Sequence, residues 1–202
     1  PWRLAHIAGF WRGTGAPIHF VSEGSDWAIR WVGQHVRDEV NLLSPSIMEV
    51  TTNPARSVDR IVHFGSPHLW LNWGKSMSTS NRFVTSFFHG RPEDGEDYAR
   101  QIDAFLESVP RLSLVVTGAE LIEQRLLRWG VPKKKVMRIP IGVDTKHFSP
   151  PSLEQRLDAR QKLGVPRDAV LIGSFQKDGN GWGEGNEPKL IKGPDVLIEV
   201  LH

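Results

Sequence analysis

The sequence predicts an α/β protein whose parallel sheet is covered by helices on both faces. Two observations predict it. Short apolar stretches with the composition of strands alternate with longer stretches in which apolar residues recur every three or four positions, the spacing of one helix face. Several of the short stretches are apolar at consecutive positions, which is typical of strands buried on both sides. We expect the connections between these strands to be right-handed crossovers.

Each element follows from a local pattern. The first clear strand is the apolar run PIHFVS, and the helix after it repeats apolar residues at positions 29, 32, 36, 40 and 43. A later helix repeats them at positions 102, 105, 106 and 109. In chain order we expect strands at 17–22, 47–52, 60–66, 82–88, 112–117 and 136–141, with helices at 27–43, 98–109 and 118–129 and a loop with a short helix at 67–82.

Capping residues indicate where the helices begin and end. Asp26 is an expected N-cap, because its carboxylate accepts hydrogen bonds from the first free amides of a helix. Thr117 and Glu120 form a T-x-x-E capping box, and Gly130 closes the helix that follows. The stretch Met137–Pro150, MRIPIGVDTKHFSP, then runs from a short strand through a glycine turn to a proline pair, which indicates a domain boundary.

Beyond this boundary the pattern starts again. Ser152 and Gln155 form another capping box, the run AVLIGSF at 169–175 predicts a buried strand, and a helix begins at Pro194. One strand and two helices do not enclose a core of their own. We therefore expect a fragment with a first domain over 1–143, a linker over 144–151 and the opening elements of an incomplete second domain over 152–202.

The composition excludes several classes of protein. The 25 Lys and Arg and 23 Asp and Glu leave a formal charge of +2, so bulk electrostatics give no case for nucleic-acid binding. The absence of cysteine excludes disulfides and thiolate metal sites, and the histidines show no metal-ligand spacing. No apolar run approaches the ~20 residues that cross a bilayer. Eight tryptophans suit either a bulky core or an aromatic surface for a sugar or a lipid.

Several motifs occur in a fixed order between residues 112 and 148. A strand ends in Thr117, the next helix ends in Gly130-Val131-Pro132, and a further strand leads into Pro140-Ile141-Gly142-Val143-Asp144 and then Phe148-Ser149-Pro150. In this order and spacing the chain resembles the family 4 glycosyltransferases, which are retaining enzymes that use nucleotide-sugar donors. Ile141 stands where that family usually has an asparagine.

The resemblance implies a Rossmann-like N-terminal domain of the two-domain GT-B fold, followed by the start of the nucleotide-sugar-binding domain. It implies transfer of a sugar from a nucleotide-diphosphate sugar to the hydroxyl of a sugar, lipid or small-molecule acceptor, with retention of configuration and with no metal or other cofactor. It also implies a cytoplasmic enzyme, with peripheral contact to the inner membrane face left open. The paired glutamates of the family fall beyond residue 202, so we expect this fragment to be inactive alone.

Two more motifs match the family and supply candidate site residues. His89-Gly90 follows the strand at 82–88, and the resemblance implies that His89 is catalytic and hydrogen-bonds either a donor-sugar hydroxyl or a backbone carbonyl near the reacting carbon. Lys192-Gly193 begins the helix KGPDVL and is a donor-binding candidate, because the resemblance implies that the lysine, together with an arginine, grips the donor diphosphate, where negative charge builds up as the nucleotide leaves. Ser174 replaces the arginine of the family, and Lys177 is the candidate substitute.

Position alone suggests the remaining candidates. Gly24 and Ser25 lie in the first strand–helix loop, where a glycine lets the backbone approach an acceptor, although a plain turn explains them equally well. Gly142 and Asp144 are the expected interdomain hinge. A non-catalytic nucleotide- or sugar-binding module remains as an alternative, whereas the missing G-x-G-x-x-G pattern disfavours a dinucleotide oxidoreductase.

Overall fold

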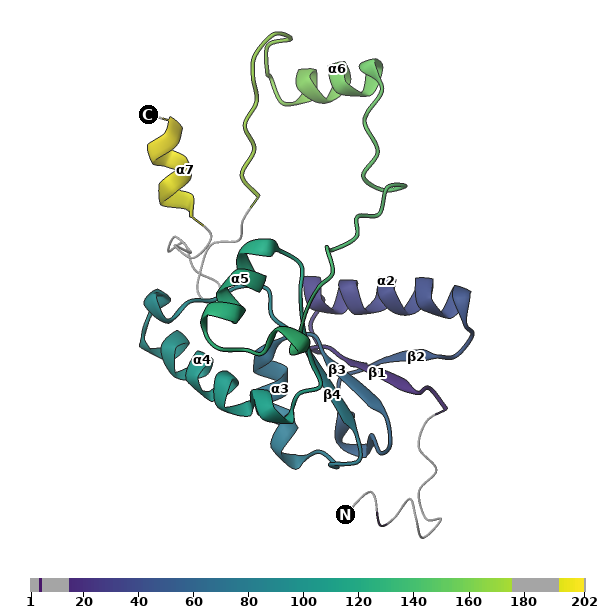
Figure 1. Ribbon diagram of the computed structural model, residues 1–202. Coiled ribbons are helices and arrows are strands. Elements are labelled where there is room, and N and C mark those ends of the chain that lie inside the picture. The colour runs from purple at the N-terminus through teal and green to yellow at the C-terminus, as the bar shows by residue number, and fades with distance from the viewer. Residues whose placement is uncertain (1–3, 5–14, 176–192, 202) are drawn as a thin grey trace. The chain divides into compact units, whose positions relative to one another are not determined.

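The computed structural model describes residue 4 and residues 15–175 and 193–201. The chain divides into two compact units, Pro1–Ile141 and Gly142–His202. The first unit holds the sheet and most of the helices (Figure 1). The second holds α6 and α7.

Six parallel strands form one sheet in the order β2-β1-β3-β4-β5-β6. The register brings Ile18 opposite Met48 on one side and Ile61 on the other. Helices flank this sheet, which confirms the predicted α/β, Rossmann-like fold. The strands are β1 (Ile18–Val21), β2 (Met48–Thr51), β3 (Ile61–Phe64), β4 (Arg82–Ser86), β5 (Leu114–Thr117) and β6 (Val136–Arg138).

The order of the strands decides which face each helix covers. The chain moves in one direction along the sheet from β1 to β2 and in the other from β3 onwards, so right-handed connections place α2 on one face and α3, α4 and α5 on the opposite one. Helices α3 and α4 lie next to each other (Figure 1). The helices of the first unit are α2 (Ala28–Leu43), α3 (Pro67–Trp73), α4 (Glu96–Ser108) and α5 (Glu120–Arg128), with short 3₁₀ turns η1 (Pro54–Arg56), η2 (Gly74–Ser76), η3 (Pro92–Asp94), η4 (Val109–Arg111) and η5 (Lys133–Lys135).

The main core lies between the sheet and the α3–α5 layer. An aromatic group occupies it, with the Trp70 ring 5.4 Å from Phe64 and 5.1 Å from Phe83, centroid to centroid. Trp70 is 1% exposed, whereas Trp31 on α2 is 54% exposed. The tryptophans therefore serve both a packed core and the surface.

Phe20 packs on the other face, between β1 and α2. A Cβ added to Gly33 of α2 would lie 2.5 Å from the Phe20 ring, and one added to Gly65 would lie 2.3 Å from Ile29 and 3.1 Å from Phe20. These two glycines therefore set how closely α2 approaches the sheet. The edge strand β2 is held to the same helix, because Asn41 donates to the Met48 carbonyl at 2.9 Å and accepts from the Met48 amide at 3.0 Å.

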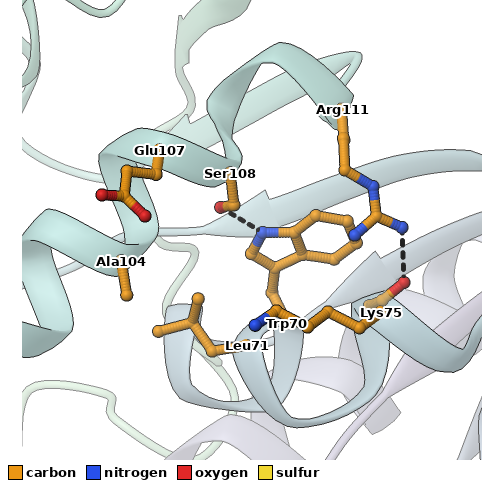
Figure 2. Close-up of a pocket in the computed structure, with 8 residues that line it drawn as sticks. Trp70, Leu71, Lys75, Ala104, Glu107, Ser108 and Arg111 are labelled. Carbon is orange, nitrogen blue, oxygen red and sulfur yellow. Dashed lines mark hydrogen bonds between the residues drawn. The ribbon is translucent and has the colours of Figure 1, made fainter.

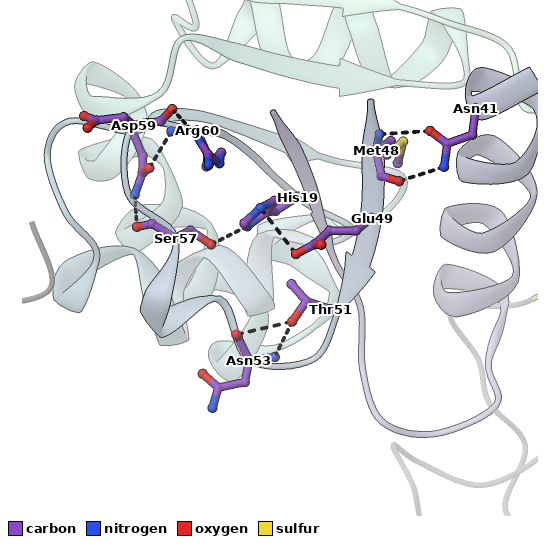
Figure 3. A network of polar contacts seen from close by, with 10 residues as sticks. His19, Asn41, Met48, Glu49, Thr51, Asn53, Ser57, Asp59 and Arg60 are labelled. Atoms are coloured by element: carbon purple, nitrogen blue, oxygen red, sulfur yellow. Dashed lines mark hydrogen bonds and ion pairs between the residues drawn. The ribbon is translucent and has the colours of Figure 1, made fainter. Parts of the chain in front are cut away.

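A buried polar group lies on β1, on the face opposite α2 (Figure 3). His19 is 4% exposed, and its Nδ1 lies 2.6 Å from the Ser57 hydroxyl while its Nε2 lies 3.3 Å from a Glu49 carboxylate oxygen. Burial lowers the pKa of His19, and the Glu49 charge partly opposes that shift. Asn81 donates to the Ser57 carbonyl at 2.8 Å. This network ties the β2–β3 connection, which has only η1 in place of a helix, to the sheet.

Two predicted caps are wrong. Helix α2 begins at Ala28, and its N-cap residue is Trp27 rather than Asp26, with no side-chain cap. Helix α5 has Ala119 as its N-cap residue, because Thr117 is the last residue of β5 and its side chain is fully buried in the sheet. The predicted end of this helix at Gly130 is confirmed. Helix α5 ends at Arg128, and Gly130 has a φ of +85°, the left-handed conformation in which helices commonly end.

The second unit contains α6 (Leu153–Lys162) and α7 (Pro194–Leu201). The capping box of α6 is confirmed: Ser152 accepts from the Gln155 amide at 3.2 Å, and Gln155 accepts from the Ser152 amide at 2.8 Å. The strand predicted at 169–175 does not form. A strand needs a hydrogen-bonded neighbour, and within the part of this unit that the structure describes no other segment is a strand.

Candidate functional site

The carboxyl ends of all six strands meet at one edge of the sheet, because every pair is parallel. The chain leaves β1 towards β2 and leaves the adjacent β3 towards β4, so the loops after β1 and β3 turn in opposite directions. Open α/β sheets bind their ligands at such a switch point, beyond the carboxyl ends of the strands. The loops at this edge therefore form the candidate site.

The loop after β1 is held in a fixed shape. Arg30 of α2 donates to the Gly24 carbonyl at 2.9 Å, and the Trp27 amide donates to the Ser25 carbonyl at 2.9 Å. A Cβ added at Gly24 would meet nothing within 4 Å, so the space above the loop is open. Gly24 and Ser25, the predicted acceptor-side residues, thus lie at the switch point, although their role stays a prediction.

Glu23 lies in the loop after β1, and His68 lies in the first turn of α3, which follows β3. Burial raises the pKa of the Glu23 carboxyl, and the charge of His68 partly opposes that shift. His68 lies in the first turn of α3, where its Nε2 is 3.0 Å from the Asn72 side-chain nitrogen. The sequence assigned neither residue a role; Glu23 is the second residue after β1, and His68 is the fourth residue after β3.

Buried oxygen atoms collect at this edge. The side-chain oxygen of Ser22 and one carboxylate oxygen of Glu23 are inaccessible to solvent and make no hydrogen bond among the described residues. The same holds for the hydroxyl of Thr117, at the end of β5. Buried polar atoms are normally hydrogen-bonded, so these three oxygens are exceptions at the carboxyl edge of the sheet.

His89 and Gly90 form the corner after β4. His89 is exposed, and Gly90 has a φ of +114°, which favours glycine. Arg125 of α5 donates to the Gly90 carbonyl at 3.1 Å, and its guanidinium lies 6.0 Å from the Trp129 ring. The corner is therefore fastened to α5. His89 lies at the same edge of the sheet as Gly24 and Ser25, and its catalytic role stays a prediction.

The remaining predicted site residues belong to the second unit or fall outside the described residues. Asp144 accepts from the amides of Lys146 at 2.9 Å and His147 at 3.1 Å, which closes a turn just after Gly142. Gly193 has a φ of +69°, and its carbonyl accepts from the Leu197 amide at 3.1 Å at the start of α7.

Lys177 and Lys192 lie outside the described residues, so their roles as donor-binding cations stay predictions. Among the residues that the structure describes, no three His, Cys, Asp or Glu side chains gather as a metal site would require.

A separate pocket lies between α3 and α4 (Figure 2). Its volume is about 330 Å³, and its residues include Leu71, Lys75 and Glu107. Arg111 lies over the Trp70 ring at 5.1 Å and donates to the Gly74 carbonyl at 2.6 Å. The pocket is at the end of α3 remote from the carboxyl edge, and one of its two cations, Arg111, is already engaged by the protein.

The chain is similar to a known protein over part of its length. No protein-family model matches the chain. The chain is 31% identical over 93 residues to a D-inositol 3-phosphate glycosyltransferase of Xylanimonas cellulosilytica, a match that covers 45% of this chain and 20% of that protein. The chain thus spans about a fifth of the curated relative's length. Over the matched residues the chain is similar to part of a glycosyltransferase, and its parallel α/β sheet is a separate observation. No described helix is long and apolar enough to cross a membrane.

Proposed function

We propose that the protein transfers a sugar from a nucleotide-diphosphate sugar to an acceptor hydroxyl with retention of configuration. The observation that carries this proposal is the partial match to a glycosyltransferase. The carboxyl edge of the first unit supports it, because His89 and the Gly24 loop both stand there, where α/β folds bind ligands. The order of motifs from Thr117 to Phe148 favours family 4 within that class.

In the proposed mechanism, the first unit holds the acceptor and contacts the donor sugar. The His89 imidazole hydrogen-bonds a sugar hydroxyl, and Arg125 fixes the corner that carries it through the Gly90 carbonyl. Lys192 and Lys177 supply positive charge to the diphosphate as its bond to the sugar breaks. Gly142 and Asp144, whose carboxylate accepts from the Lys146 and His147 amides, form the proposed interdomain hinge.

The experiment uses the product of the complete gene. It is incubated with UDP- and GDP-sugars and a panel of sugar and lipid acceptors, and the anomeric configuration of the product is read by NMR. We expect transfer with retention that is unaffected by a chelator. Nucleotide binding without transfer would instead favour a non-catalytic module. That alternative has support in the sequence, because Ser174 replaces the arginine with which the family grips the donor diphosphate.

The donor grip has its own test. Lys192→Ala is expected to weaken nucleotide-sugar binding about tenfold or more in titration calorimetry, because it removes a charge-assisted contact to phosphate. Lys189→Ala, three residues away, is the matched control and should bind like the wild type. Unchanged affinity in Lys192→Ala would remove this residue from the donor site.

A further inference from the structure

The pocket between α3 and α4 has walls that the protein itself holds in place. The Trp70 indole Nε1 donates to the Ser108 hydroxyl at 2.6 Å, and that hydroxyl donates in turn to the Phe105 carbonyl at 2.6 Å. The Arg111 guanidinium lies 5.1 Å from the Trp70 ring and donates to the Gly74 carbonyl at 2.6 Å (Figure 2). These contacts join α3 and η2 on one wall to α4 and η4 on the other, so the recess does not depend on a ligand for its shape.

The size of the pocket suits a small molecule. Its volume is about 330 Å³, close to the lower end of the range of roughly 300–1,000 Å³ that ligand pockets occupy. Leu71 and Ala104 contribute apolar side chains to the lining, beside the Trp70 ring (Figure 2). The lining therefore favours a small ligand with a short apolar group.

Two opposite charges line this pocket, one from each wall. Lys75 belongs to η2 and Glu107 to α4. Their side chains form no ion pair with each other, and neither makes a hydrogen bond or ion pair with any other residue in the described part of the chain. Elsewhere on α4 exposed charges do pair, since Arg100 contacts both Glu96 and Asp97. The pocket thus presents an ammonium and a carboxylate that a ligand can engage.

A zwitterion carries the complementary charges in one molecule. Its carboxylate accepts hydrogen bonds from the Lys75 ammonium, and its own ammonium donates to the Glu107 carboxylate. A simple anion would meet like charge at Glu107, and a simple cation would meet like charge at Lys75. An α-amino acid with an aliphatic side chain combines the two charges with an apolar group for Leu71 and Ala104.

We propose that the pocket between α3 and α4 binds a free aliphatic α-amino acid as its zwitterion, between Lys75 and Glu107. The pocket lies at the end of α3 remote from the carboxyl edge, so this ligand is neither the sugar donor nor the acceptor of the proposed function. Lys75 and Glu107 are exposed, and exposed ion pairs contribute little each, so we expect a Kd on the order of 1 mM.

The test uses three forms of one compound on the full-length protein. L-leucine carries both charges, L-leucinamide lacks the carboxylate, and N-acetyl-L-leucine lacks the ammonium. Binding is followed by NMR at the indole N–H signal of Trp70, because this indole lies in the wall of the pocket. We expect leucine to shift the signal and to bind at least about fivefold more tightly than either derivative.

Two substitutions separate the two charges. Lys75→Gln should abolish the preference for leucine over leucinamide and keep the preference over N-acetyl-leucine, whereas Glu107→Gln should do the reverse. Both side chains are exposed, so the fold should tolerate these changes. Lys134→Gln and Asp103→Asn, at exposed positions outside the pocket lining, are the matched controls and should keep both preferences.

The proposal is overturned by a Trp70 signal that responds to none of the three probes, by equal affinity for all three, or by preferences that survive both substitutions. None of these measurements includes a nucleotide sugar. Their outcome is therefore independent of whether the full-length protein transfers a sugar.

Discussion

His63 gives the molecule a predictable sensitivity to acid. It lies on β3, with its Nε2 2.9 Å from the Ser86 hydroxyl and its ring 4.9 Å from that of Phe20. Burial lowers the pKa of His63 from 6.5 to about 4. We predict that replacing it by glutamine, which retains a hydrogen-bonding group for Ser86, removes a specific part of the pH dependence of stability.

The magnitude follows from linkage between protonation and folding. Between pH 6.5 and about 4 the unfolded chain binds a proton at this histidine and the folded chain does not, so protonation favours unfolding. The free energy of unfolding therefore falls by about 1.4 kcal/mol per pH unit across this window. The full contribution of about 3 kcal/mol is present above pH 6.5 and lost below pH 4.

Urea unfolding followed by tryptophan fluorescence, at pH values from 4.5 to 7.5, measures the effect. The wild type should lose stability more steeply than His63→Gln on acidification, and the difference isolates His63, because the buried His19 contributes to both proteins. His35→Gln, an exposed position on α2, is the control and should keep the wild-type slope. Parallel curves for wild type and His63→Gln would refute the reasoning.

Three other substitutions test contacts that shape the first unit. Gly33→Ala should lower the free energy of unfolding by about 1–3 kcal/mol, because its Cβ would lie 2.5 Å from the Phe20 ring, and urea unfolding measures this. Lys135→Met should cost about 2–3 kcal/mol in the same assay, since the ammonium donates to three backbone carbonyls at 2.7–3.0 Å. Arg125→Ala should speed hydrogen exchange at the corner around Gly90, because that corner loses its link to α5.

Matched controls separate these effects from general damage. Gly15→Ala adds a Cβ that meets nothing within 4 Å, and it should leave stability within about 0.5 kcal/mol of wild type. Lys134→Met removes an exposed neighbour of Lys135, and Arg128→Ala removes an exposed arginine from the same helix as Arg125. If a control changes its readout as much as the paired variant, the contact assigned to that variant is not the cause.

The alternating pattern of the sequence was sufficient to predict the sheet and its main helices. Consecutive apolar residues predicted β3 and β5. The spacing of apolar residues from Ile29 to Leu43 predicted the ends of α2 to within a residue or two. Boundaries were less predictable because tertiary contacts decide them. Thr117 has the chemistry of an N-cap, yet the sheet buries it as a strand residue.

The candidate site was predictable only in part. His89 and Gly24 were found because each follows a predicted strand, and parallel strands bring such loops to one edge. The switch point itself was missed, because it depends on β1 and β3 being neighbours although β2 lies between them in sequence. Arg125 was missed for a similar reason, since 35 residues separate it from Gly90.

The link between Asn41 and Met48 has a consequence for how molecules of this protein meet. Strand β2 ends the sheet, and Met48 directs its amide and carbonyl away from β1, towards Asn41. An incoming strand from another molecule would need these same two backbone groups. The Asn41 amide already occupies them, so a side chain takes the place of a seventh strand and protects the open edge of the sheet from intermolecular β-pairing.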